Sequence, residues 1–330
     1  MEKILSISVA AYNVEKFIEK NLDSFVDSEV KEYIEVLVTD DGSKDGTTDI
    51  VKKYETKYPG VVRLIQQKNA GPGSTVNSGI KHATGKYFRM VDGDDWVDTK
   101  NLKNYIGFLK NNDADMVVTH FTSVDNDTME EKQNIVSGKE YNKILNFEEQ
   151  CLDLSLEMHN VTYKTKILKE KNIVLDNGFY TDVEYLLLPI PYVKTIAFLD
   201  TNIYMYRVSL ATQSMSAASM QKNIAMHELV LKRLINHYEE TKKKNNCAEN
   251  HLKHMSRRIA NMAGTHLAIL LSFEVDKKYK EELKELFKYV KNSSEDIYNE
   301  YAKKKTVKVL NYTKFITYPV ISKMYKIKHA

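Results

Sequence analysis

The sequence predicts an α/β fold in which a mostly parallel central sheet is flanked by helices, followed by an α-helical C-terminal region. Strand and helix patterns alternate over residues 1–120, as they do in a series of βαβ units. Short loops with turn-forming residues separate these patterns. Beyond residue 218 no proline occurs before Pro319, and apolar residues recur at helical spacing, for example Met255, Ile259 and Met262.

The expected sheet is built from five segments in chain order. Residues 4–10 are rich in β-forming side chains and predict the first strand. Residues 14–25 carry apolar side chains at helical spacing and predict the helix that follows it. The remaining strands are expected at residues 33–40, 61–67, 86–92 and 114–121. Ligands are expected at the carboxyl ends of these strands.

Composition narrows the class of protein. The chain has 330 residues, 42% of them hydrophobic and 28% charged, which is typical of a globular protein large enough for two domains. Cys151 and Cys247 are far apart and match no metal-ligand spacing, so a reducing, cytoplasmic setting is expected. The first apolar run is too short for a signal peptide, and no window reaches the ~18 apolar residues of a membrane span.

We expect a domain boundary between residues 1–217 and a helical region, residues 218–330. The last part of this region differs from the rest of the chain in its charge. Residues 303–330 contain eight lysines and no acidic residue, so the remainder of the chain is net acidic although the total charge is +3. One interpretation is a basic amphipathic helix, bent at Pro319, that lies on an anionic membrane surface. The other is that its apolar face packs on the helical region or on a second subunit. Because the rest of the chain is net acidic, we do not expect nucleic acid as a binding partner.

The glycine-containing segment GPGSTVNSG, residues 71–79, matches neither common nucleotide motif. Val76 stands where the dinucleotide fingerprint needs its third glycine, and no glycine–lysine pair completes a phosphate-binding Walker loop. What remains is a loop of small polar residues entering a helix, where a backbone can approach a phosphate or a sugar. The alternative is a helix start whose glycines permit close packing.

Four aspartates crowd the segment RMVDGDDWVD, residues 89–98, where a predicted strand ends. Carboxylates this close repel one another unless a cation, a helix terminus or water lies among them. The residues at the required positions do not fit an EF-hand. Asp98 precedes a helical pattern and is expected to cap it. Asp92 and Asp94, separated by Gly93, could hold a divalent cation that also binds a diphosphate.

Five segments occur together in order: SISVAAYNVEKFIEKNLDSF, VLVTDDGSKDGT, QKNAGPGSTVNSGI, ATGKYFRMVDGDDWV and YTDVEYLL. Their order and spacing, over residues 3–215, resemble the family 2 glycosyltransferases with the GT-A fold, bacterial enzymes of capsule, exopolysaccharide and wall-glycan synthesis. The resemblance implies a GT-A catalytic domain and inverting transfer of a hexosyl or N-acetylhexosaminyl group. The donor would be a UDP-sugar, the acceptor a glycan or a lipid-linked saccharide, and the cofactor Mn²⁺ or Mg²⁺. The enzyme would be cytoplasmic, with its tail on the inner face of the cell membrane.

The resemblance also assigns residues on the donor side. Tyr12 would lie against the base, and Asp41 would accept a hydrogen bond from the uracil imide, with Asp40 supporting that turn. Asp92 and Asp94 would be the metal pair, with Asp94 the more direct ligand, and Asp95 would face the sugar or the acceptor. The remaining donor-binding residues implied are Ala10, Asn69, Gly71, Asn77 and Gly93. Three more, Arg207, Ser214 and Ser216, would belong to a segment that closes over the diphosphate.

The acceptor hydroxyl must lose a proton during attack, and the resemblance assigns Asp182 as the general base. The family usually has Glu-Asp where this chain has Thr181-Asp182, so Glu184 is the candidate to replace the missing acid. Val76 stands near the place of a donor-site arginine, for which Arg89 or Lys68 could substitute. Two alternatives stay open: a nucleotidyltransferase of similar fold, and a non-catalytic subunit that binds nucleotide-sugars or glycans.

Overall fold

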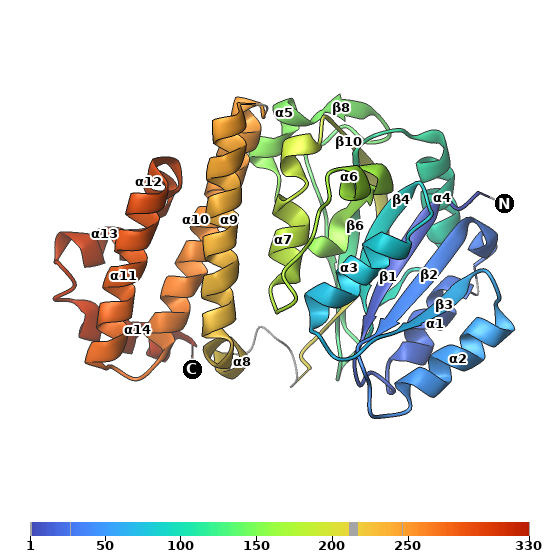
Figure 1. Cartoon of the computed structure of the whole chain (residues 1–330), viewed down its shortest axis with the longest axis horizontal. Coiled ribbons are helices and arrows are strands. Elements are labelled where there is room, and N and C mark those ends of the chain that lie inside the picture. The colour runs from blue at the N-terminus through green and yellow to red at the C-terminus, as the bar shows by residue number, and fades with distance from the viewer. Residues whose placement is uncertain (1, 27, 211–216, 246, 330) are drawn as a thin grey trace. The chain divides into compact units, whose positions relative to one another are not determined.

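The structure is a computed structural model that describes all residues except 1, 27, 211–216, 246 and 330. The chain forms two compact units, Met1–Leu210 and Ala211–Ala330 (Figure 1). The predicted boundary after residue 217 lies a short way beyond this division.

In the described part of the first unit, ten strands form one mixed sheet. Its order is β3-β2-β1-β4-β9-β6-β10-β5, with β7 paired to β6 and β8 paired to β10. The strands are β1 (Leu5–Ala11), β2 (Ile34–Asp40), β3 (Val62–Gln66), β4 (Tyr87–Asp92), β5 (Trp96–Val97), β6 (Met116–Asp125), β7 (Glu131–Asn134), β8 (Ile144–Asn146), β9 (Val161–Lys164) and β10 (Thr195–Val208). Strands β1 to β4 pair in parallel, as do β6 and β10, and β9 is antiparallel to both of its neighbours.

Helices cover this sheet because its central strands are apolar on both faces. The side chains of Val9, Val36 and Phe88 are completely buried, and α3 lies against β1 and β2 (Figure 1). The helices of this unit are α1 (Ile18–Val26), α2 (Thr47–Lys57), α3 (Pro72–His82), α4 (Leu102–Asn111), α5 (Phe147–Gln150), α6 (Thr165–Glu170) and α7 (Thr181–Leu187). Four 3-10 turns join them, at Lys31–Tyr33, Cys151–Asp153, Met158–Asn160 and Ile190–Tyr192.

The five predicted strands are all present, within a few residues of their expected bounds. The predicted helix at residues 14–25 begins later, at Ile18, because Val14 lies in the turn that precedes it. The expectation that Asp98 caps the next helix is wrong. Its carboxylate accepts hydrogen bonds from the Lys100 N–H (3.0 Å) and the Asn101 side chain (2.8 Å), so it stabilises the turn that precedes α4.

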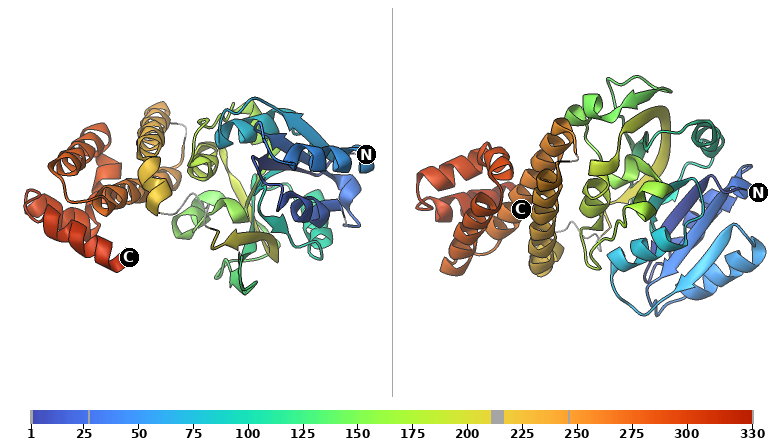
Figure 2. Two further views of the ribbon diagram at one scale, coloured as in Figure 1. Left: turned by 90° about the horizontal axis from the view of Figure 1, so that it is seen from below. Right: turned by 45° about the horizontal axis from the view of Figure 1, so that its top comes forward.

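The second unit is helical, as predicted. Its helices are α8 (Ala217–Lys222), α9 (Ile224–Lys244), α10 (Glu249–Ser272), α11 (Lys277–Ser293), α12 (Glu295–Ala302), α13 (Lys305–Tyr312) and α14 (Tyr318–His329). Helix α10 is central and lies beside α9 and α11 (Figures 1 and 2). Its core residues Met255, Ile259 and Ala263 are completely buried. Within the described residues, none of the helices combines the length and the hydropathy that a bilayer-spanning segment needs.

Two histidines face each other inside this helical unit. His227 of α9 and His266 of α10 are 2% and 4% exposed, and their Nδ1 atoms lie 3.1 Å apart. Burial, and then the neighbouring imidazole, lowers the pKa of His227 to about 3. Burial likewise lowers the pKa of His266 to about 4, with Glu228 opposing the shift. Both rings are therefore neutral at pH 7, and one N–H donates to the other ring.

This pair predicts a stability that depends on pH. Each histidine binds a proton more tightly in the unfolded chain, near pKa 6.5, than in the folded one, so the unit loses stability as the pH falls below 6.5. Between pH 7 and pH 5 we expect a loss of about 2 kcal/mol per histidine. Urea unfolding of wild type and His227→Asn measures it. The variant should show a flatter dependence, and a His82→Asn control in the other unit should match wild type; equal slopes for all three proteins would contradict the prediction.

Candidate functional site

The acidic segment forms a tight turn where β4 ends beside β1. Asp92 pairs with Ala10 in the sheet, and the Gly93 N–H donates to the Ala10 carbonyl oxygen at 3.1 Å. A Cβ at Gly93 would lie 2.7 Å from the same oxygen, so the turn needs a glycine there. Carboxylate oxygens of Asp92, Asp94 and Asp95 consequently come within 4.8 Å of one another.

Asp95 is turned into the protein and holds this turn against β10. It is 1% exposed; its Oδ2 accepts the Tyr204 hydroxyl at 2.6 Å, and its Oδ1 accepts the Arg207 N–H at 2.7 Å. The Asn21 side chain donates to the carbonyl oxygens of both Asp92 (3.1 Å) and Asp95 (2.9 Å). Asp95 is thus buried and engaged by β10, and its expected place beside the sugar or the acceptor stays a prediction.

Arg207 supports the same turn from β10. Its side chain is 7% exposed, and Nε donates to the Asp94 carbonyl oxygen at 2.9 Å. Its guanidinium lies 4.9 Å from the ring centre of Trp96 and 4.8 Å from that of Phe17. The structure thus places Arg207 in a packed strand, where sequence reasoning expected a closing segment. Ser214 and Ser216, the other residues of that expected segment, lie outside the described residues.

Asp92 and Asp94 have oxygens left for a ligand. Within the described part of the chain, no other residue donates a hydrogen bond to either carboxylate. Burial, and then the charges of Asp94 and Asp182, raises the pKa of the Asp92 carboxyl. Burial also raises the pKa of Asp94, while the Arg207 charge opposes it. Two crowded, partly buried carboxylates without donors fit a hard divalent cation, whose charge would relieve their repulsion.

At the end of β2, the carboxylates of Asp40 and Asp41 accept hydrogen bonds that fix the neighbouring loops. Asp40 accepts the Ser43 N–H at 3.0 Å and the Thr48 hydroxyl. Asp41 is 3% exposed, and its Oδ1 accepts the Gln67 side chain (2.7 Å) and the Ala70 N–H (2.9 Å). Its Oδ2 accepts the Gly71 N–H at 2.9 Å.

An oxygen of a carboxylate has two acceptor sites, so the hydrogen bond from Gly71 occupies one of the two on Oδ2 of Asp41. The Asp41 N–H donates to the Ala11 carbonyl oxygen at 2.9 Å, next to Tyr12. The Tyr12 ring is 48% exposed, and Asn69 is exposed as well. These groups leave an accessible aromatic ring and one acceptor near the place where a base was expected.

The glycines before α3 pack against the segment that leads to α7. A Cβ at Gly71, whose φ is +96°, would overlap the Asn177 carbonyl oxygen, and one at Gly73 would overlap that of Asp176. Asn77 donates to the Leu175 carbonyl oxygen and accepts the Leu175 N–H, both at 2.8 Å. The close-packing interpretation of these glycines is therefore confirmed. Asn77 positions residue 175, in contrast to the expectation that it lines the donor side.

Asp182 stands in the first turn of α7, near the acidic turn. Its charge raises the pKa of Asp92 and of Tyr206, so its carboxylate lies within electrostatic range of the acidic turn. Thr181 stands where the resemblance leads one to expect a glutamate, and Glu184 does not take the place of that acid. Glu184 is 1% exposed and accepts the Asp176 N–H at 2.6 Å, so it serves the loop before α7.

Sequence reasoning missed the aromatic side chains of β10. The Tyr204 hydroxyl accepts the Asp92 N–H at 3.1 Å and donates to Asp95. Tyr206 stacks on His159 with ring centres 4.1 Å apart, and burial together with the charges of Asp95 and Asp92 raises its pKa to about 12. The sequence did contain a signal for them: Tyr204 and Tyr206 are two residues apart, a spacing that places two side chains on the same face of a strand.

The structure also corrects the expectation that Arg89 replaces the absent donor-site arginine. Arg89 is 1% exposed and lies in the core, where it donates to the hydroxyls of Tyr105 (3.2 Å) and Thr162 (3.1 Å). It also lies 5.7 Å from the ring centre of Tyr204, beneath the acidic turn. Lys68 is exposed in the loop after β3. Arg89 therefore supports the site from inside and does not reach a donor.

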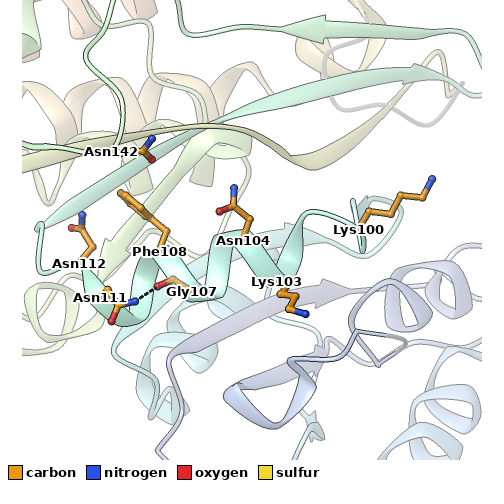
Figure 3. Close-up of a pocket in the computed structure, with 8 residues that line it drawn as sticks. All are labelled: Lys100, Lys103, Asn104, Gly107, Phe108, Asn111, Asn112 and Asn142. Atoms are coloured by element: carbon orange, nitrogen blue, oxygen red, sulfur yellow. Dashed lines mark hydrogen bonds between the residues drawn. The ribbon is translucent and has the colours of Figure 1, made fainter.

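A separate hollow of about 790 Å³ lies along α4 (Figure 3). Asn104, Phe108 and Asn142 face a common space there, while Lys103 points to the other side of the helix and pairs with Glu29 at 2.8 Å. None of the predicted site residues lines it. The acidic turn and this hollow are thus different features of the first unit.

The packing of α3 yields a testable prediction. Gly73→Ala forces a Cβ into the Asp176 carbonyl oxygen, so we expect a loss of about 1–3 kcal/mol and displacement of the segment that carries Asp182. Gly107→Ala is the matched control, because a Cβ on this helical glycine meets nothing within 4 Å; it should be neutral or stabilising by up to about 1 kcal/mol. Thermal unfolding measures both. Equal melting temperatures for the two variants would refute the packing argument.

Comparison with known proteins agrees with this geometry. Residues 6–171 match the family model described as "Glycosyl transferase family 2". The chain is 28% identical over 218 residues to the uncharacterized glycosyltransferase EpsJ of Bacillus subtilis (strain 168), covering 63% of this chain and 62% of that one. It is 37% identical over 116 residues to the poly(ribitol-phosphate) beta-glucosyltransferase of Bacillus spizizenii, covering 34% and 18%.

A further relative links sequence and fold. The poly(ribitol-phosphate) beta-N-acetylglucosaminyltransferase TarS of Staphylococcus aureus (strain Mu50) is 26% identical over 224 residues, which cover 64% of this chain and 37% of TarS. The chain thus spans less than two thirds of the length of these relatives. The crystal structure of TarS 1-349 in complex with UDP-GlcNAc has a TM-score of 0.67 at 20% identity, covering 98% of this chain and 92% of that one. The shared GT-A fold and the matching family model show that this chain belongs to glycosyl transferase family 2.

Proposed function

We propose that this protein is an inverting glycosyltransferase that moves a sugar from a UDP-sugar to a glycan or lipid-linked acceptor in bacterial surface polysaccharide synthesis. One observation carries the proposal: the Asp92 and Asp94 carboxylates lie together at the end of β4 without hydrogen-bond donors from other described residues, within electrostatic range of Asp182. Two carboxylates for a cation and one for a proton are what this transfer needs.

The acidic turn is suited to the donor diphosphate. Asp92 and Asp94 would hold Mn²⁺ or Mg²⁺, and the remaining oxygens of the turn are tied down by Tyr204 and Arg207. When bound, the cation supplies positive charge to the nucleoside diphosphate as it leaves. Gly93 keeps the turn close to Ala10, so the backbone there offers no side-chain bulk to a ligand at the strand end.

The end of β1 and β2 is suited to the base and ribose. The Tyr12 ring is accessible for stacking, and Oδ2 of Asp41 has one acceptor position for an imide N–H. An imide N–H is present in uracil, which supports a UDP-sugar as the donor. Asn69 precedes Ala70 and Gly71, whose backbone N–H groups donate to Asp41, and it would complete this side.

Asp182 is proposed as the base that accepts the acceptor hydroxyl proton while that oxygen attacks the anomeric carbon. The C–O bond to the diphosphate breaks in the same displacement, so an α-linked donor gives a β-linked product. The relatives named as beta-glucosyl- and beta-N-acetylglucosaminyltransferases support glucose or N-acetylglucosamine as the first sugars to test. Their poly(ribitol-phosphate) acceptors likewise suggest a first acceptor. A cytoplasmic location is part of this proposal.

The function is tested by incubating the protein with Mn²⁺, poly(ribitol phosphate) and either UDP-glucose or UDP-GlcNAc. We expect release of UDP that depends on the acceptor and on the metal. Pyrophosphate release from a nucleoside triphosphate would indicate a nucleotidyltransferase instead. Binding of UDP-sugars without UDP release, across a panel of donors and acceptors, would indicate a non-catalytic subunit.

The role of Asp182 predicts a specific defect. Asp182→Asn should lower turnover by at least roughly 100-fold while UDP binding persists, because a positioned base contributes about that much or more. Asp49→Asn is the matched control, since Asp49 is also an acid in the first turn of a helix, α2, on an exposed surface. Steady-state UDP release and UDP titration by calorimetry measure the two effects. An Asp182→Asn variant with wild-type turnover would remove Asp182 from this role.

A further inference from the structure

The C-terminal tail presents a stripe of apolar side chains, which we call the outer tail face. It consists of Val309, Tyr312, Ile316, Val320, Met324 and Ile327, which are 45%, 91%, 76%, 60%, 64% and 80% exposed. In α14, Val320, Met324 and Ile327 follow the spacing that places side chains on one side of a helix. Val309 and Tyr312 have the equivalent spacing in α13. Exposed large apolar side chains scattered singly are ordinary, but several that share one side of a helix mark a contact surface.

The opposite side of the tail is anchored in the helical unit. Leu310, Tyr318 and Ser322 are at most 1% exposed. The Ser322 hydroxyl donates to the Leu271 carbonyl oxygen of α10 at 2.9 Å. The Phe315 ring meets Phe287 of α11 with ring centres 4.9 Å apart. Because these contacts fix which side of each helix is buried, the outer tail face is directed away from its own unit.

Lysines accompany this face and lack acidic partners. Lys305, Lys308, Lys314 and Lys323 are exposed, and none of them forms an ion pair with another described residue. Other lysines of the tail are engaged: Lys303 pairs with Glu300 at 2.6 Å, and Lys326 pairs with Glu274 at 2.8 Å. Since residues 303–330 contain no acid, the face combines apolar side chains with uncompensated positive charge.

We propose that the outer tail face lies on an anionic lipid surface, with its apolar side chains among the acyl chains and its lysines at the headgroups. Helices with this distribution of charge and apolar side chains lie in the plane of a membrane interface. A second copy of the chain fits less well, because a twofold interface places the same patch against itself and would oppose lysine to lysine. Tyr312, the most exposed of these side chains, has the amphipathic ring favoured at such interfaces.

Flotation of the full chain with vesicles tests the proposal. Wild type should float with phosphatidylcholine vesicles that contain about 30% phosphatidylglycerol, and much less with phosphatidylcholine alone. The variant Ile316→Ser, Val320→Ser, Met324→Ser should lower the bound fraction at least about 10-fold. Leu229→Ser is the matched control, because Leu229 is a 48% exposed apolar residue on α9 of the same unit; it should bind as wild type does.

A second set of variants separates charge from apolar contact. Lys308→Gln, Lys314→Gln, Lys323→Gln should weaken binding to the anionic vesicles and remove most of its salt dependence. The same change at three exposed lysines elsewhere in the unit, Lys243, Lys244 and Lys288, should have little effect. Equal loss in both charge variants would overturn the proposal, because attraction would then be nonspecific.

Two further outcomes would contradict the membrane assignment. One is wild-type protein that fails to float with anionic vesicles. The other is a wild-type dimer in analytical ultracentrifugation that the triple serine variant converts to monomer, which would make the face a subunit interface. UDP release on a water-soluble acceptor should be the same in wild type and in all tail variants. Failure of flotation would therefore not contradict the proposed sugar transfer. Failure of sugar transfer would not contradict the proposed membrane contact of the outer tail face.

Discussion

The site depends on the hydrogen bonds that Tyr204 and Arg207 of β10 make to Asp95. These bonds take up both oxygens of one carboxylate and fix the turn after β4, so that Asp92 and Asp94 stay close together despite their repulsion. Arg89, buried beneath Tyr204, and Arg207, beside the Asp94 carbonyl oxygen, supply the nearby positive charge. One acid of the cluster is thereby used to hold the fold, which leaves two for a ligand.

A second constraint brings the proposed base to this turn. Gly71 and Gly73 allow the start of α3 to touch the backbone of residues 176–178, and Asn77 holds residue 175 through two hydrogen bonds. The chain then enters α7 with Asp182 in its first turn. Asp41, at the end of β2, accepts hydrogen bonds from the loop that leads into α3. This loop therefore connects the expected base-binding side to the segment that carries Asp182. Changes in the loop should therefore reach both ends of a bound donor.

Sequence reasoning predicted the fold and the cluster of acids at a strand end, since alternating apolar runs and crowded aspartates are local signals. It could not assign each polar side chain to ligand or to fold. Asp95, Asn77 and Arg207 have the chemistry of ligand-binding residues, but partners more than ninety residues away in the chain engage them. The same limit hid Tyr204 and Tyr206, whose roles depend on β10 lying next to the acidic turn. The pairing of Lys326 with Glu274 likewise depends on a contact with a loop 52 residues away in the chain.

The central claim is that Asp92 and Asp94 bind a divalent cation together with the donor diphosphate. Anomalous diffraction at the manganese edge, from crystals grown with UDP and Mn²⁺, tests it most directly. We expect an anomalous peak at ligand distance from a carboxylate oxygen of Asp92 or Asp94 and in contact with the UDP diphosphate. Bound UDP without a peak at this turn, or a peak held by other residues, would contradict it.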